Sequence, residues 1–117
     1  MKSGSEKRRN QRLRAASGIQ GIERLSGMPI TLRDFNLKAV AIESRNRILA
    51  NKPVELELQH EGNSLVIHGM PIRSDRIVGR SGNATWLTAV EVRWSTPQER
   101  SQFEAFLWAV PRSSRQG

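Results

Sequence analysis

The sequence contains no cysteine and no tyrosine. The lack of cysteine excludes disulfide bonds, thiolate metal sites and thiol nucleophiles, and it fits the reducing cytoplasm. No run approaches the roughly 20 apolar residues that a membrane-spanning helix needs, and the N-terminus lacks the apolar core of a secretory signal peptide. We therefore expect a soluble, cytoplasmic protein.

Patterns of known catalytic and metal sites are also missing. His60 and His68 are the only histidines, and neither has a serine or carboxylate at a known catalytic or metal-binding spacing. Asp34 and Asp75 are the only aspartates, and no HExxH, GxGxxG, P-loop or EF-hand pattern occurs. The sequence therefore predicts a protein that is not an enzyme, that has no metal site or cofactor, and whose histidines are structural.

Positive charge is abundant, and it is concentrated at one end of the chain. The 117 residues include 19 Lys and Arg against 11 Asp and Glu, which gives a formal net charge of +8. Residues 1–14 contain six basic residues and one acidic residue, so they hold +5 of this charge. Such a segment favours an anionic partner, either a polymer or a small phosphorylated ligand, and net charge alone does not separate the two.

The basic segment ends in a run rich in arginine, residues 7–14, which contains Arg8, Arg9 and Arg12. Arginine stays charged at physiological pH, and its planar donors match two phosphate oxygens at once. Because Arg8 and Arg12 are four residues apart, they share one side of a helix or of an extended chain. The run is therefore suited to clamp an anion. The alternative from composition is a solvated, disordered basic tail.

The rest of the chain predicts mainly β structure. Residues 15–27 are rich in glycine and serine and are interpreted as a connector with one irregular helical turn at 22–25. Strands are predicted at 30–32, 37–42, 54–59, 65–70 and 86–94, with loops at 44–52, 61–64 and 76–83. These short strands predict a small antiparallel β-barrel.

A C-terminal helix is predicted after the strands. Thr96 is placed as its N-cap, Pro97 as its first residue, and Glu99 completes a capping box. Pro111 ends the helix. The apolar residues at i, i+3, i+4 and i+7 spacing are Phe103, Phe106, Leu107 and Val110. This stripe is expected to pack on the open end of the barrel.

Asp34 is the most informative acidic residue. It lies at a polar break between two predicted strands and is followed by Asn36. A carboxylate accepts paired N–H donors, and the edge of guanine offers such a pair. The alternative is that Asp34 closes an Asx-type turn. Together with the arginine run, Asp34 and Asn36 would supply both the phosphate and the base contacts of a nucleotide site.

The order and spacing of these segments resemble the PilZ domain family. The family's receptors for the bacterial second messenger cyclic di-GMP (c-di-GMP) carry an RxxxR motif, followed about twenty residues later by [D/N]xSxxG. Residues 8–12 fit the first motif, and the hydrophobic Leu13 follows as is usual. In residues 34–39, Asp34 matches the second motif, while Asn36 replaces its Ser and Ala39 replaces its Gly.

The resemblance implies a fold, a ligand and a mode of signalling. It implies a small split or Greek-key barrel with a C-terminal helix, divided into a flexible basic segment (1–28), the barrel and helix (29–110) and a tail (111–117). It further implies a c-di-GMP receptor that orders its arginine-rich N-terminal loop and signals to a downstream protein partner. The residues implied in ligand binding are Arg8, Arg9, Arg12, Asp34, Asn36 and Ala39.

Two other functions are compatible with the sequence. Because Asn36 and Ala39 depart from the family motif, the chain could be a degenerate PilZ-type module that binds another protein without nucleotide. A small basic barrel that binds nucleic acid is the third and less favoured hypothesis. Polymer binding would weaken steeply with salt and would show no preference for a cyclic dinucleotide.

Overall fold

A computed structural model of the protein describes residues 13–79 and 82–109. Its elements are β1 (Leu13–Glu23), β2 (Met28–Phe35), β3 (Ala39–Ser44), β4 (Val54–His60), β5 (Asn63–Val78), β6 (Ala84–Arg93) and α2 (Pro97–Ala109). The six strands form a closed barrel in the order β1-β2-β3-β6-β5-β4, and every neighbouring pair is antiparallel. The predicted fold class, a small antiparallel β-barrel with a C-terminal helix, is confirmed.

Alternating side chains fill the barrel interior. In β4, Val54, Leu56 and Leu58 are buried, whereas Glu55 and Glu57 between them are partly exposed. The same alternation in the other strands gives one core. Its buried apolar residues are Ile19, Ile30, Leu32, Phe35, Val40, Ile42, Ile48, Val54, Leu56, Leu58, Ile67, Val90, Val92, Phe103 and Leu107. Two of these, Phe103 and Leu107, belong to α2, so the helix completes the core.

The predicted connector at 15–27 is wrong, because most of it is strand β1. This strand pairs with β2 on one side and with β4 on the other, and so closes the barrel. A Cβ at Gly21 would overlap the carbonyl oxygen of Glu57, so glycine is required where the two strands approach. The single helical turn predicted at 22–25 lies slightly later: residues 24–27 form the turn into β2, in which the Gly27 N–H donates to the Glu23 carbonyl at 2.7 Å and Gly27 has a φ of 77°.

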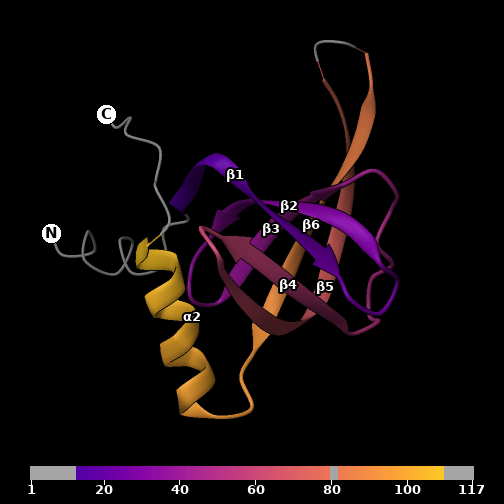
Figure 1. The fold of residues 1–117 in the computed structure, drawn as a ribbon. Helices are drawn as coiled ribbons and strands as arrows, with labels where there is room; N and C mark the ends of the chain where they lie inside the picture. Colours follow the sequence, from indigo (N-terminus) through magenta and orange to yellow (C-terminus); the bar gives the residue numbers. More distant parts are fainter. Residues whose placement is uncertain (1–12, 80–81, 110–117) are drawn as a thin grey trace, which may run out of the picture.

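Strand β5 is longer than predicted. It continues through Gly69 and Pro71 with a bulge between Pro71 and Arg73, and it ends only at Val78. The predicted loop at 76–83 is thus wrong in its first half, since Arg76 pairs with Trp86 across the β5–β6 hairpin. This hairpin projects beyond the body of the barrel in Figure 1.

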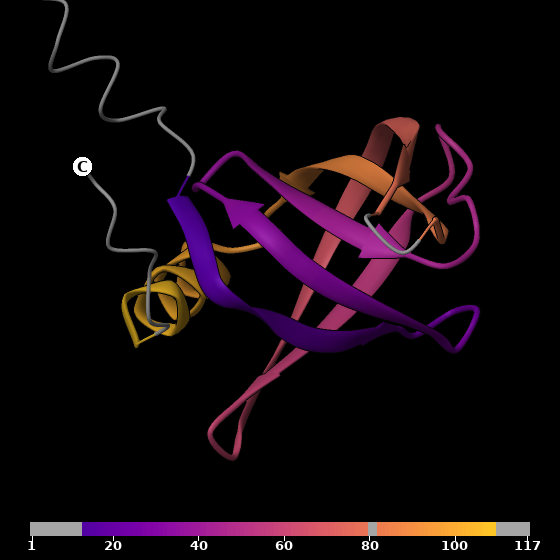
Figure 2. The ribbon, with the colours of Figure 1, turned by 90° about the horizontal axis from the view of Figure 1, so that it is seen from above.

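The C-terminal helix begins as predicted. The Thr96 hydroxyl accepts a hydrogen bond from the Glu99 N–H at 3.1 Å, and the Glu99 carboxylate accepts one from the Ser95 N–H at 2.8 Å. These bonds satisfy N–H groups that have no partner within the helix. The helix lies on the side of the barrel where β1 begins (Figures 1 and 2). It is not long and apolar enough to cross a membrane.

Candidate functional site

The structure places the second group of predicted site residues at one end of the β2–β3 hairpin. Asp34 lies near the end of β2, Asn36 lies in the turn, and Ala39 is the first residue of β3. The first group, Arg8, Arg9 and Arg12, lies outside the described residues.

A bulge turns Asp34 outward. Leu32 pairs with Ile42 and Asp34 pairs with Ala41, so Arg33 is an extra residue on β2. Leu32 and Phe35 are both fully buried although they are three residues apart. The two residues between them therefore both lie on the outside of the barrel, where Asp34 is half-buried.

Asn36 builds the turn that follows. Its side-chain Oδ1 accepts hydrogen bonds from the N–H of Lys38 at 2.7 Å and from the N–H of Ala39 at 2.8 Å. Its own N–H donates to the Ala39 carbonyl at 2.9 Å. Asn36, two residues after Asp34, thus makes an Asx-type turn.

Ala39 adopts ordinary strand backbone. Among the described non-glycine residues, only Asn51 and Glu61 have a positive φ. The backbone at Ala39 therefore does not need the glycine that the family motif has at this position. If glycine favours binding here, the reason is the space that its missing Cβ leaves for a ligand.

Strand pairing joins this hairpin to the end of the basic run. Leu13 pairs with Phe35, and Arg14 pairs with Asp34, across β1 and β2. Arg12 directly precedes Leu13 in the sequence. The described part of the chain therefore begins, directly after Arg12 in the sequence, beside the end of β2 that carries Asp34.

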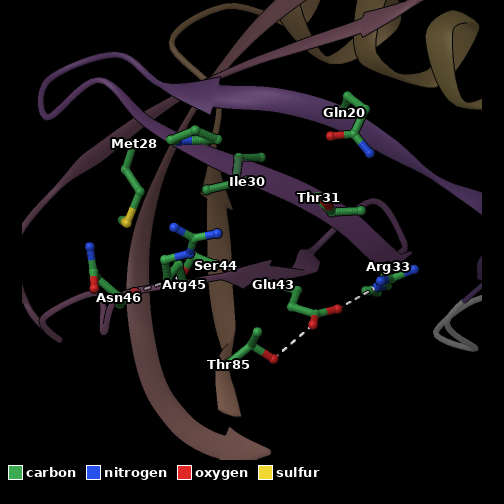
Figure 3. A pocket seen from close by; sticks show the side chains of 11 residues that line it. Gln20, Met28, Ile30, Thr31, Arg33, Glu43, Ser44, Arg45, Asn46 and Thr85 are labelled. Atoms are coloured by element: carbon green, nitrogen blue, oxygen red, sulfur yellow. Dashed lines mark hydrogen bonds and ion pairs between the residues drawn. The ribbon is translucent and has the colours of Figure 1, made fainter. Parts of the chain in front are cut away.

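A groove of about 500 Å³ crosses the outside of the barrel beside Arg33, the neighbour of Asp34 (Figure 3). The residues that line it are Gln20, Met28, Pro29, Ile30, Thr31, Arg33, Glu43, Ser44, Arg45, Asn46 and Thr85. The three predicted site residues that the structure describes, Asp34, Asn36 and Ala39, are not among them. The groove thus begins where the predicted site ends, and extends along β2 and β3 toward the opposite end of these strands.

The Glu43 carboxylate links two other residues that line the groove. Glu43 accepts a hydrogen bond from the Thr85 hydroxyl at 2.7 Å and another from Arg33 Nε at 2.7 Å (Figure 3). The Thr85 bond lowers the pKa of Glu43 more than its partial burial raises it, and Arg33 lowers it further. The Glu43 carboxylate is therefore charged at neutral pH and holds the Arg33 guanidinium in place.

Sequence reasoning did not identify Arg33, Glu43 or Arg45. The outward position of Glu43 follows from the alternation of β3, in which Val40 and Ile42 are buried. Nothing in the sequence links Glu43 to Arg33, which is ten residues away, or to Thr85, which is 42 residues away. Only the barrel brings these three strands together.

The histidines occupy separate places on the barrel. His60 packs edge-on against Phe106 of α2, with ring centroids 6.4 Å apart, and lines a hollow of about 450 Å³ between the helix and the start of β5. His68 lies 3.7 Å from a carboxylate oxygen of Glu55. No group of three or more potential metal ligands occurs among the described residues.

Comparison with known proteins identifies the fold. No protein-family model and no curated protein sequence matches the chain. The PilZ domain of YcgR from Escherichia coli with c-di-GMP superposes with a TM-score of 0.67 at 9% identity, over 85% of this chain and 87% of that chain. The protein has a PilZ-like fold. The resemblance seen in the sequence motifs is thus confirmed for the fold.

A second solved protein shares the PilZ-like fold. K. pneumonia MrkH in its apo state gives a TM-score of 0.69 at 12% identity, over 85% of this chain and 49% of that chain. The MrkH complex with c-di-GMP gives 0.63 at 12% identity, over 83% and 48%. The chain therefore spans about half the length of MrkH.

Proposed function

We propose that the protein is a receptor for c-di-GMP. The observation that carries this proposal is the backbone pairing of Arg14 with Asp34, which brings the end of the basic run to the Asp34 end of the β2–β3 hairpin. A basic segment that leads into the barrel beside a carboxylate would match a ligand that has both phosphates and guanine bases. The c-di-GMP complexes of YcgR and MrkH, which share the fold, support the same ligand.

The phosphates are assigned to the basic run. Arg8, Arg9 and Arg12 offer planar pairs of donors that bind phosphate oxygens in a bidentate manner. The cyclic dinucleotide has two phosphates, so it can engage more than one of these arginines at once. This multiple engagement distinguishes the ligand from a mononucleotide.

A guanine base is assigned to the β2–β3 hairpin. The Asp34 carboxylate lies on the outside of the barrel and can accept the two N–H donors of the guanine edge. Asn36 holds the turn in shape through its bonds to Lys38 and Ala39. Ala39 then lies beneath the ligand, where the family motif has glycine.

Ligand binding would order the N-terminal segment. Five like charges in the run Lys7–Arg14 repel one another, and the ligand phosphates would neutralise them. The segment would then fold against the barrel next to β1, on the side where α2 packs (Figure 2). The surface formed there is the one that a downstream protein partner would recognise.

Calorimetric titration of the full chain with c-di-GMP tests this function. We expect saturable binding with no comparable response to GMP or to cyclic di-AMP. Asp34→Ala should weaken binding at least tenfold, whereas Asp75→Ala, at an aspartate on the β5–β6 hairpin, should not. Absence of c-di-GMP binding by the folded protein would reject the receptor function and favour the module that binds protein without nucleotide.

Salt dependence separates the receptor from a nucleic-acid-binding barrel. Binding of a polymer that releases many counterions falls by orders of magnitude between 50 and 200 mM salt. A cyclic dinucleotide with two phosphates should show a shallow dependence. Tight, steeply salt-dependent binding of RNA or DNA, without c-di-GMP binding, would instead support the nucleic-acid hypothesis.

A further inference from the structure

The outer half of the β5–β6 hairpin stands apart from the rest of the barrel. Strand β4 pairs with β5 only as far as Gly69, and β3 pairs with β6 only as far as Trp86. Beyond these points, Ile77 and Val78 pair only with Thr85 and Ala84 of the same hairpin. The hairpin therefore projects from the body of the molecule (Figure 1).

Exposed apolar side chains gather on β5 and on the β3–β4 loop, which is hydrogen-bonded to β5. Seven large apolar residues are exposed within the described part of the chain, and four of them belong to this region. Val78 is 63% exposed and Ile72 is 56% exposed on β5. Leu49 is 57% exposed in the β3–β4 loop, where the carbonyl of its neighbour Ile48 accepts a bond from the Ser74 hydroxyl.

The apolar residues near the hairpin tip lie on both faces. Ile77 and Val78 are consecutive in a strand, so their side chains point to opposite faces, and both are exposed, at 36% and 63%. A flat protein surface would cover only one of these faces. A lipid interface surrounds an inserted tip and covers both.

Unpaired positive charge lies beside these apolar residues. Arg47 and Arg76 have no carboxylate within ion-pair distance among the described residues, and the Arg47 guanidinium lies 5.4 Å from the ring centre of Trp86. Trp86 pairs with Arg76 across the hairpin, so the side chains of these two residues lie on the same face of the hairpin. The nearby acid, Asp75, is paired with Arg73 at 3.1 Å.

We propose that the hairpin surface, defined as Arg47, Leu49, Arg76, Ile77 and Val78, docks the protein on an anionic lipid surface. The aliphatic side chains would enter the boundary between headgroups and acyl chains, while the two guanidinium groups would bind lipid phosphates. Single-stranded nucleic acid fits less well, because the exposed side chains are aliphatic and Arg47 lies over the Trp86 ring.

Co-sedimentation with vesicles tests the proposal on the full chain. We expect binding to vesicles of phosphatidylglycerol and phosphatidylcholine in equal parts, and binding at least tenfold weaker to pure phosphatidylcholine. Val78→Asp should weaken binding about tenfold. The matched control is Leu25→Asp, at an apolar residue that is 67% exposed in the β1–β2 turn, and it should leave binding unchanged.

The charges are tested in the same assay. Arg76→Glu should weaken vesicle binding by about fivefold or more, whereas Arg100→Glu on α2 should have a much smaller effect. Circular dichroism melts confirm that each variant is folded. If the hairpin variants bind like the wild type, and binding is lost only when Arg8 and Arg12 are replaced by serine, the N-terminal run is responsible and the proposal is overturned.

Insertion of the tip has a direct optical test, because the chain has no cysteine and a single introduced thiol can be labelled selectively. A polarity-sensitive fluorophore on Asn83→Cys, beside β6 at the tip, should brighten on adding the anionic vesicles. The same label on Gln98→Cys, in the first turn of α2 at the other end of the molecule, should not (Figure 1). Equal responses from both positions, or none, would overturn the proposal.

Discussion

At the scale of single residues, Asn36 shows how a departure from a motif can keep a structural role. Its side-chain oxygen accepts two backbone N–H donors at the point where β2 turns into β3. A serine hydroxyl is shorter and would reach fewer of these donors. The amide therefore shapes the hairpin that presents Asp34, whether or not it also contacts a ligand.

The arginine run carries the first prediction. Arg12→Ala should weaken c-di-GMP binding by one to several orders of magnitude, because each charge-assisted hydrogen bond contributes about 1.5–3 kcal/mol and a bidentate pair has two. Calorimetry gives the affinity, and the thermal melt should be unchanged. Arg100→Ala, at an exposed arginine of α2, is the control. Unchanged affinity in Arg12→Ala would remove this residue from the site.

Ala39 and Asn36 carry the second prediction. Ala39→Gly combined with Asn36→Ser should strengthen c-di-GMP binding, since the Cβ of Ala39 would no longer face the ligand. The double variant should also be less stable by about 1 kcal/mol or more, because glycine costs backbone entropy in a strand and a serine in place of Asn36 would accept fewer of the bonds that Asn36 accepts. Calorimetry and urea unfolding measure the two effects. Weaker binding would show that the barrel has adapted to its own residues.

A buried carboxylate, Glu23, carries a prediction about pH. Only 4% of Glu23 is exposed, and it accepts hydrogen bonds from the N–H and hydroxyl of Ser26 and from the N–H of Glu55. Burial by itself raises the pKa of Glu23, but these bonds together bring it below its ordinary value of 4.5. The stability that ionised Glu23 contributes is therefore present above about pH 4.5 and is lost as the pH falls through the lower folded pKa.

Urea unfolding of Glu23→Gln tests this role. The variant should lose about 1–3 kcal/mol at pH 7, because an amide cannot accept from all the donors that face the carboxylate. The difference from the wild type should shrink at pH 3, where part of the wild-type contribution is lost. Glu104→Gln on the exposed side of α2 should behave like the wild type. A loss that is independent of pH would show that the charge of Glu23 is unimportant.

At the scale of secondary-structure elements, α2 joins the core with a narrower stripe than the sequence suggests. Phe103 is fully buried and packs on Trp94 with ring centres 5.0 Å apart. Phe106 is only partly buried and packs beside His60, and Val110 lies outside the described residues. The helix is therefore anchored mainly by Phe103 and Leu107.

Thermal melts of three variants test this anchoring. Phe103→Ala should cost about 3–5 kcal/mol, which corresponds to a fall of more than ten degrees in Tm. Phe106→Ala should lower Tm by less, and Gln102→Ala, at an exposed position, should change it little. If Phe103→Ala melts like the wild type, α2 is not part of the cooperative core.

Strand β1 shows why one element was missed. Its glycine and serine content predicts a connector, yet it pairs on both edges and closes the barrel. Gly21 is needed there because the carbonyl of Glu57 leaves no space for a Cβ. From the sequence alone, a glycine that a neighbouring strand requires cannot be distinguished from a glycine in a flexible connector.

At the scale of the whole molecule, β1 starts beside the β2–β3 hairpin, so the proposed ligand binding should be visible both in the stability of the barrel and in the segment that precedes β1. At a hundred times Kd, c-di-GMP should add about 2.7 kcal/mol to the free energy of unfolding, and Tm should rise accordingly. It should also slow tryptic cleavage after Arg8, Arg9 and Arg12 by at least tenfold. Binding that leaves these cleavage rates unchanged would retain the receptor function but reject the ordering of the segment.

The sequence by itself determined the class of fold, the start of the C-terminal helix and the concentration of charge before β1. Periodicity and capping are local, so Val54, Leu56 and Leu58 and the Thr96 cap could be interpreted without knowledge of the rest of the chain. The order of the motifs predicted a PilZ-like fold, and the structure confirms it. The roles of Arg8, Arg9 and Arg12 remain predictions.

Only the tertiary structure decided what depends on partners far along the chain. Closure of β1 against β4, the bond network of Arg33, Glu43 and Thr85, and the projection of the β5–β6 hairpin all follow from strand pairing across long sequence separations. The physical reason is that the backbone N–H and C=O groups along the edges of a strand form their hydrogen bonds with other strands. The residues of one strand show which face is buried, but they do not show which neighbour it will have.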